Sequence, residues 1–211
     1  MRSIRHLTPR YIVNRTIEKL YRRTHPGIAW LTPDANDILD SCLCKEDRGI
    51  EFGSGNSTVW FAKRVAFLDS VEHQANWYEK IAQMLDEARL DNVRYHLHAR
   101  DADDNPDASG YVRIADSFAL GSLDFALVDG IYRAHCVRAV IDKLKPGGLL
   151  IIDNVNLYLP CESMAPNSVP VDGKPVTPVW QEVYDVIHLW RTIWTSNGVS
   201  DTAIFIKPCT E

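Results

Sequence analysis

Five short apolar segments alternate with helical patterns between residues 49 and 154, and this alternation constrains the fold more than any other feature. Helical spacing of apolar residues separates the segments, as in the stripe that begins at Trp77 and Ile81. Such an order predicts a parallel sheet covered by helices on both faces, a doubly wound α/β fold. The segments are Gly49–Phe52, Val65–Glu72, Val93–His98, Leu123–Gly130 and Leu149–Asn154.

The C-terminal part departs from this order. Arg191–Ser196 and Thr202–Pro208 flank Asn197-Gly198, and the gap has no room for a crossover helix. An Asn-Gly pair between two strand-like segments predicts an antiparallel hairpin. We therefore expect a Rossmann-like, mostly parallel seven-stranded sheet that ends in this hairpin.

The 211 residues fit one domain with additions. Residues 1–29 form a basic arm with a weak amphipathic pattern, either a solvated helix or a contact for an acidic or membrane surface. Residues 30–211 form the main domain. Within it, residues 155–178 hold five prolines and little periodicity, which predicts either an active-site lid or a plain surface loop. "KPGG" after the helical pattern of Arg133–Leu144 predicts the end of that helix.

Charge and cysteine content exclude several classes of protein. The net charge of -5 and the lack of a Lys/Arg cluster disfavour a nucleic-acid partner and favour a small molecule. No apolar run has the length that a membrane span requires. Five scattered cysteines suggest neither zinc nor a disulfide framework, so the cytoplasm is the expected location. The sequence is compatible with a homodimer.

The turn after the first strand indicates the kind of ligand. Gly53 and Gly55 follow a strand and precede a helix, but the third glycine of a dinucleotide fingerprint is missing. Glu51 adds negative charge that disfavours a pyrophosphate and suits an amine-bearing ligand. Glu72 ends the second strand, where an acid can accept both ribose hydroxyls. An amino-acid-bearing nucleoside such as S-adenosylmethionine fits both acids.

On these motifs the chain resembles the class I S-adenosylmethionine-dependent methyltransferases. The matching pieces are "EFGSGNST", "SVEH", "LDFALVDG", "LKPGGLLIIDN" and the terminal "TAIFIKP", from about Trp30 to the C-terminus. The resemblance implies that Glu51, Gly53 and Gly55 line the methionine end of the cofactor. Glu72 would hold the ribose, and Arg100 and Asp101 would flank the adenine. The full candidate set for the cofactor is Glu51, Phe52, Gly53, Ser54, Gly55, Ser57, Thr58, Glu72, His73, Arg100, Asp101 and Asp129. Alternatively, Glu51 caps a helix and Asp101 is a solvated loop acid.

The ends of the fourth and fifth strands carry Asp129 and Asp153-Asn154. This pattern resembles catechol and caffeoyl-coenzyme A O-methyltransferases, which implies Asp129, Asp153 and Asn154 as ligands of Mg²⁺ or another divalent cation. The lysine that serves as base in catechol methyltransferases is replaced by Tyr132. Candidate catalytic residues are therefore Asp129, Tyr132, Arg133 and His135. Alternatively, Arg133 and His135 are ordinary helix residues and Asp153-Asn154 is a turn.

The leading hypothesis is O-methylation of a small-molecule acceptor. The base-methylating [DN]-P-P-[YF] motif is absent, since "VDGIYR" stands in its place. A non-catalytic methyltransferase-like subunit and a nicotinamide dinucleotide oxidoreductase are the alternatives. Trp30, Tyr158, Trp180 and Trp190 are candidate walls of an acceptor pocket, although aromatic residues at helical spacing are often core.

Overall fold

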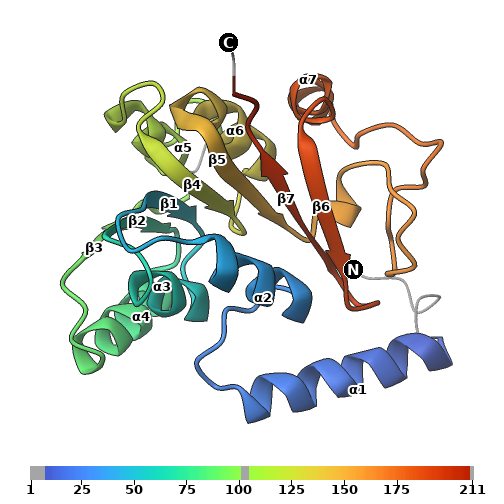
Figure 1. The fold of residues 1–211 in the computed structure, drawn as a ribbon, viewed down its shortest axis with the longest axis horizontal. Helices are drawn as coiled ribbons and strands as arrows, with labels where there is room; N and C mark the ends of the chain where they lie inside the picture. Colours follow the sequence, from blue (N-terminus) through green and yellow to red (C-terminus); the bar gives the residue numbers. More distant parts are fainter. Residues whose placement is uncertain (1–7, 101–104, 210–211) are drawn as a thin grey trace.

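A single seven-stranded sheet forms the centre of the protein (Figure 1). The structure is a computed structural model and describes residues 8–100 and 105–209. The strand order is β3-β2-β1-β4-β5-β7-β6, so β1 and β4 lie side by side at the middle of the sheet. The strands are β1 Arg48–Phe52, β2 Phe67–Glu72, β3 Val93–Leu97, β4 Leu123–Val128, β5 Leu144–Asp153, β6 Arg191–Ser196 and β7 Asp201–Ile206.

Strand directions confirm the predicted fold class. β1, β2, β3, β4 and β5 pair in parallel, and β7 pairs antiparallel with both β5 and β6. The Asn197-Gly198 turn joins β6 to β7, and Gly198 takes a positive φ of 74°. The parallel strands bring their carboxyl ends to one edge of the sheet, and this edge positions the site described below.

Helices cover both faces of the sheet and bury two separate cores. On one face, α5, α6 and α7 pack over a core that includes Phe52, Tyr111 and Val137. On the other, α2 and α3 pack over Leu39, Phe61 and Phe125, with α4 beside α3. The helices are α1 Pro9–Thr24, α2 Pro33–Cys42, α3 Asn56–Ala62, α4 Ala75–Glu87, α5 Gly110–Arg113, α6 Arg133–Val140 and α7 Pro178–Ile187.

The largest difference from a predicted strand boundary is at the start of β5; the other predicted boundaries agree with the structure to within two residues. β5 begins at Leu144 rather than Leu149, so the sequence "KPGG" lies inside the strand and not in a simple helix stop. Gly147 takes a φ of 78° there, and the pairing with β4 shifts register between Leu123 and Phe125. Residues with turn propensity are tolerated because this irregular part of the strand is a bulge.

The two less regular parts of the chain also take defined positions. Residues 1–29 contain α1, in which Ile12, Ile17 and Leu20 of the apolar pattern are more than half exposed. Residues 155–178 hold the short 3-10 helix η4 Val155–Leu157 and a long irregular run beside it. Among the described helices, none has the length and apolarity to cross a membrane. All five cysteines are free thiols.

Candidate active site

The glycine turn brings the ends of β1 and β4 into direct backbone contact. Gly53 has a φ of +98°, and a Cβ built on it would lie 2.6 Å from the backbone N and Cα of Gly130. The amide of Asp129 donates to the carbonyl of Phe52 at 2.9 Å. Only glycine allows both the backbone conformation and this approach. The junction leaves bare backbone at the place where the sequence predicts the cofactor.

Glu51 lies beneath this turn and is fully buried. Its carboxylate accepts hydrogen bonds from the hydroxyls of Ser57, Thr58 and Ser70, the last two at 2.6 Å. Burial raises the pKa of Glu51 to about 7, while the three hydroxyl donors act in the opposite direction. The predicted residues Ser57 and Thr58 thus support the acid from inside the fold. Any attraction of Glu51 for a cofactor amine acts through space across the turn.

Glu72 ends β2 and is held by the residues around it. One carboxylate oxygen accepts from the backbone amides of His73 and Gln74, each at 2.8 Å. The other accepts from the Ser54 hydroxyl at 2.9 Å, and Ser54 also contacts the Tyr95 hydroxyl at 2.6 Å. Ser54, Glu72 and His73, which the sequence predicts at the cofactor, are therefore in one cluster. A ribose hydroxyl could exchange with Ser54 as donor to Glu72.

Tyr111 is a residue that the sequence analysis missed. It is fully buried, and its hydroxyl presses against Gly130 so closely that a Cβ there would lie 1.8 Å away. The hydroxyl has no hydrogen-bond partner among the described residues. Burial raises its pKa well above the ordinary value, so it stays a neutral donor. A buried, unpaired O–H beside bare backbone fits a ligand with an acceptor group, as the cofactor's carboxylate would be.

Asp129 and Arg133 form an ion pair at the end of β4. Arg133 starts α6 and donates to the Asp129 carboxylate at 2.8 Å and to the Asp129 carbonyl at 2.7 Å. Its other nitrogens donate to the carbonyls of Gly130, at 3.0 Å, and Asp153. Arg133 thereby ties the end of β4 to the end of β5. Burial raises the pKa of Asp129, against the lowering effect of the Arg133 charge.

Asp153 is held from two sides at the end of β5. The Thr202 hydroxyl of β7 donates to one carboxylate oxygen at 2.7 Å, and the Asn154 amide donates to the other at 2.6 Å. Burial raises its pKa to about 8, and the neighbouring charge of Asp129 adds to the effect. Asp129, Asp153 and Asn154 are therefore brought together, as predicted.

In this arrangement Arg133 competes with a divalent cation for these three side chains. Mg²⁺ is typically held by one or two carboxylates and several waters, and one carboxylate oxygen of Asp129 is already bound to Arg133. The amide nitrogen of Asn154, and not its oxygen, faces Asp153. One guanidinium lies beside the two carboxylates, and its positive charge would repel a metal ion bound next to it. Among the described residues, no group of three or more His, Cys, Asp and Glu is arranged to bind a metal.

The remaining predicted residues lie in different places. Tyr132 takes a left-handed φ of 53° ahead of α6 and lines a cavity of about 270 Å³ with Arg100, whose guanidinium lies 5.6 Å from the Tyr132 ring centre. His135 faces away from the acids, with its ring nitrogen 3.3 Å from Asp107. The prediction for Asp101 lies outside the described residues. The Phe52 side chain is in the core, and Gly55 is extended.

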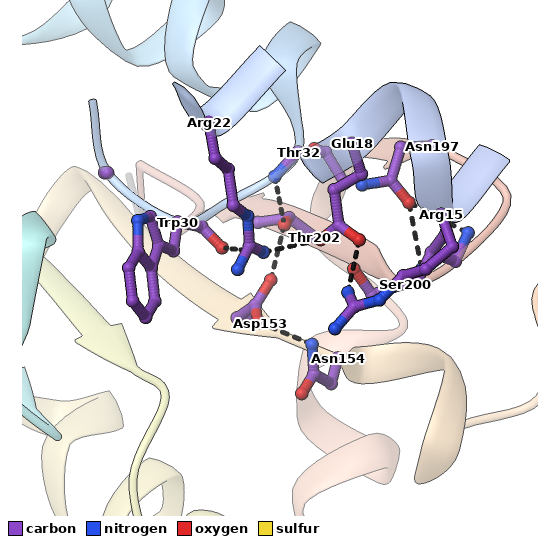
Figure 2. A network of polar contacts seen from close by, with 12 residues as sticks. Arg15, Glu18, Arg22, Trp30, Thr32, Asp153, Asn154, Asn197, Ser200 and Thr202 are labelled. Carbon is purple, nitrogen blue, oxygen red and sulfur yellow. Dashed lines mark hydrogen bonds and ion pairs between the residues drawn. The ribbon is translucent and has the colours of Figure 1, made fainter. Parts of the chain in front are cut away.

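A second cavity, of about 220 Å³, lies between α1 and the carboxyl ends of β4 and β5. Figure 2 shows Glu18 and Arg22 pointing from α1 toward Asp153 and Asn154. Trp30 also lines this cavity and is 43% exposed, so a ligand could contact its ring. Of the other aromatic candidates, Trp180 and Trp190 are both core residues. Trp180 stacks on Tyr158, with the ring centres 5.0 Å apart.

The sheet order, the glycine junction and the acids at the strand ends define the class I methyltransferase architecture. A family model described as "Methyltransferase domain" matches residues 50–155. The chain belongs to this family and is an S-adenosylmethionine-dependent methyltransferase. No curated protein matches the sequence.

Solved structures share the fold at low sequence identity. A methyltransferase from Geobacter sulfurreducens has a TM-score of 0.58 at 14% identity, covering 96% of this chain and 92% of its own. A Staphylococcus aureus protein proposed to be a caffeoyl-CoA O-methyltransferase has a TM-score of 0.57 at 14% identity, covering 96% and 94%. A Streptococcus mutans protein proposed to be a methyltransferase, solved with S-adenosylhomocysteine, has a TM-score of 0.52 at 14% identity, covering 81% and 94%. At these identities the likeness shows the fold alone.

Proposed function

We propose that this methyltransferase methylates a hydroxyl oxygen of a small molecule, and that it does so without a metal ion. The observation that carries the proposal is the common position of Asp129, Asp153 and Arg133 at the ends of β4 and β5, next to the Gly53–Gly130 junction. In open α/β sheets ligands bind outside these strand ends. Acids at this position suit an acceptor that must lose a proton.

The cofactor fits the bare backbone at Gly53 and Gly130 and the unpaired Tyr111 hydroxyl. S-adenosylmethionine supplies an electrophilic methyl group bound to a sulfonium. Glu72 and Ser54 would hold the ribose. The hydrogen bond from the His73 backbone amide to one Glu72 oxygen keeps the carboxylate in place. Tyr111 would donate to the methionine carboxylate.

The chain's acids would orient the acceptor and receive its proton. The acceptor hydroxyl would donate to the pair formed by Asp129 and Asp153. Its proton would pass to that pair as the new C–O bond forms and the bond between the methyl carbon and the cofactor sulfur breaks, which leaves S-adenosylhomocysteine. The Arg133 guanidinium keeps positive charge beside the developing oxyanion, which is the place that a metal occupies in metal-assisted enzymes. Methyl transfer depends mainly on this positioning.

Calorimetry with S-adenosylhomocysteine tests the cofactor site. We expect the wild-type protein to bind it and Glu72→Ala to weaken binding about 10-fold or more, because a charged hydrogen bond contributes roughly 1.5–3 kcal/mol. Unchanged affinity in the variant would refute the ribose role. Stabilisation by a nicotinamide dinucleotide alone would refute the proposed class of cofactor.

Turnover of a catechol-type acceptor tests the reaction. We expect the methylated oxygen product with or without a chelator, and loss of turnover in Asp153→Asn while S-adenosylhomocysteine binding is retained. Activity that disappears with chelator and returns with Mg²⁺ would restore the metal hypothesis. Cofactor binding without turnover of any hydroxyl acceptor would favour a non-catalytic subunit.

A further inference from the structure

Helix α1 turns a charged face toward the protein and its apolar residues toward solvent, the reverse of an ordinary surface helix. Its apolar residues Ile12, Val13, Ile17 and Leu20 are 53–60% exposed, while Glu18 is only 7% exposed. Surface helices normally turn their apolar stripe inward and leave charges in water. Burial of a carboxylate is unfavourable unless it is paired. The inward charged face of α1 therefore needs a reason.

Two arginines flank Glu18 on this inward face. Arg22 contacts one carboxylate oxygen of Glu18 at 2.6 Å, and Arg15 contacts the other. Each arginine is a helical turn away from Glu18, so α1 presents the three side chains as one row (Figure 2). Two guanidiniums against one carboxylate leave one positive charge in excess, on arginine side chains that are 39% and 28% exposed around the buried Glu18.

The arginines have donors left over for a ligand. A guanidinium carries five N–H donors. In the described part of the chain, Arg15 donates to Glu18 alone, and Arg22 donates to Glu18 and to the Trp30 carbonyl at 3.5 Å. Both arginines line the same cavity of about 220 Å³ as Asp129, Asp153 and Trp30. Free cationic donors thus face a cavity whose opposite wall carries acids.

We propose that Arg15 and Arg22 bind a carboxylate or phosphate group of the methyl acceptor. The proposal rests on the proposed function, since the opposite wall of the cavity is the acid pair that would receive the hydroxyl. The charges fix the orientation, because an anionic group beside Asp129 and Asp153 would be repelled, whereas beside the arginines it is attracted. The acceptor is thus a small hydroxylated acid whose anionic end lies under α1.

The size and wall of the cavity narrow the ligand further. A cavity of about 220 Å³ admits a small molecule. Trp30 offers an exposed ring at this cavity, and the Arg22 guanidinium lies 5.0 Å from its centre. A flat molecule with one anionic substituent can lie against this ring while arginine forks contact its acid group. Glu18 then acts as a positioning residue that holds both arginines.

Three probes test the proposal on protein saturated with S-adenosylhomocysteine. They are 3,4-dihydroxybenzoate, 4-hydroxyphenyl phosphate and the neutral 3,4-dihydroxybenzyl alcohol, each measured by calorimetry and thermal shift. We expect at least one anionic probe to bind about 10-fold more tightly than the neutral one, or tighter still. Whichever anionic probe binds more tightly shows whether the site prefers a carboxylate or a phosphate. Binding should weaken as salt increases.

Variants of α1 locate the effect. Arg15→Gln and Arg22→Gln should each lower the affinity for the anionic probe roughly 10-fold and leave the affinity for the neutral probe unchanged. Arg22→Lys keeps a charge beside Glu18, so it should fold normally yet bind the anion less well without the bidentate fork. The matched control is Arg23→Gln, because Arg23 is the exposed neighbour in the same turn. This control should bind all probes as the wild type does.

Each contrary outcome is decisive. Equal binding of neutral and anionic probes, no binding of either anion at millimolar concentration, or anion binding unaffected in Arg15→Gln and Arg22→Lys would overturn the proposal. The preceding titration with S-adenosylhomocysteine distinguishes a failure of the proposed function from a failure of the proposed role of α1. Failure to bind it refutes the proposed function, whereas normal binding without an anion preference refutes only the role of α1.

Discussion

Two pairs of acids lie at the same edge of the sheet and are stabilised in different ways. Glu51 and Glu72, at the ends of β1 and β2, lie among groups without a permanent charge: hydroxyls for Glu51, and a hydroxyl, backbone amides and the His73 ring for Glu72. Asp129 and Asp153, at the ends of β4 and β5, lie beside the guanidinium of Arg133. Arg133 therefore supplies positive charge to the acids on the β4 and β5 side of the Gly53–Gly130 junction. The acids on the β1 and β2 side have no permanent cation beside them.

The difference matches what each side would bind. A cofactor with an amine and a sulfonium brings its own positive charge, so its side of the junction needs acids without a resident cation. An acceptor hydroxyl that becomes an oxyanion needs a cation already in place. The junction separates a place that receives positive charge from a place that supplies it.

Removal of Arg133 should have the largest effect on stability, because Arg133 supplies the positive charge that distinguishes the two sides of the junction. Arg133→Ala leaves the Asp129 carboxylate and three backbone carbonyls without their donor. Loss of one partner of a fully buried ion pair costs about 3–5 kcal/mol, and the Asp129 side chain is 30% exposed. We therefore expect the free energy of unfolding in urea, followed by tryptophan fluorescence, to fall by about 3 kcal/mol, at the lower end of that range.

The control for this prediction is Arg138→Ala on the same helix. Arg138 pairs with Asp107 and Glu182 at the surface and should contribute about 1 kcal/mol or less. Equal losses from the two variants would mean that Arg133 is no more than a surface ion pair. Because the Asp129 oxygen is released in Arg133→Ala, Mn²⁺ should raise the melting temperature of this variant more than that of the wild type.

Glu51 gives the next largest effect, through pH. Its folded pKa of about 7 lies above the ordinary value of 4.5, so between these values the folded state holds a proton that the unfolded state has lost. The stability that neutral Glu51 contributes is present below pH 4.5 and is lost as pH rises through 7, by about 3 kcal/mol. Glu51→Gln should remove this part of the pH dependence.

The measurement is the difference between the wild-type and Glu51→Gln stability curves across that pH range. Taking the difference separates Glu51 from Asp153, whose raised pKa acts with the same sign. A flat difference curve would show that Glu51 is ionised in the folded protein at every pH tested. S-adenosylmethionine should bind the wild type more tightly as pH rises through 7, because the cation favours ionised Glu51.

Gly53→Ala would disturb the junction between the two sides. The new Cβ would lie 2.6 Å from the Gly130 backbone, in addition to the strain of a φ of +98°. Gly121→Ala is the matched control, since Gly121 has a φ of +61° with no atom within 4 Å of a new Cβ. We expect Gly53→Ala to be less stable than the control by about 1–3 kcal/mol and to bind S-adenosylhomocysteine more weakly. Equal stabilities would show that the junction can open at no cost.

The sequence predicted those parts of the fold that depend on local patterns. The apolar segments that end at Phe52, Glu72 and Asn154 predicted strands because strand period and turn residues are local signals. The Asn197-Gly198 turn predicted the hairpin for the same reason. "KPGG" gave the wrong strand boundary because Leu144 already pairs with Leu123 of β4, and the turn residues that follow form a bulge within the strand.

The site was predicted in its residue types but not in its pairings. Asp129, Asp153 and Asn154 were expected to meet, and they do. That Arg133 would lie among them, in the place expected for a metal, depends on the direction of a side chain at the start of α6, which spacing does not reveal. The inward charged face of α1 was equally hidden, because its apolar pattern predicts the opposite orientation.

The smallest expected effect concerns Tyr111, whose hydroxyl faces the junction from the core. Tyr111→Phe removes an unpaired buried O–H, so the stability of the free protein should change by less than about 1 kcal/mol and should rise if it changes. Tyr95→Phe is the control: it removes a hydroxyl bonded to Ser54 at 2.6 Å and should lower stability by about 0.5–1.5 kcal/mol. With S-adenosylhomocysteine present, we expect Tyr111→Phe to lose affinity severalfold, because the donor that the fold leaves unpaired is then missing from the complex. Denaturant unfolding with and without the ligand measures both effects, and a Tyr111→Phe protein that is less stable alone and binds normally would show that the hydroxyl serves the fold and not the cofactor.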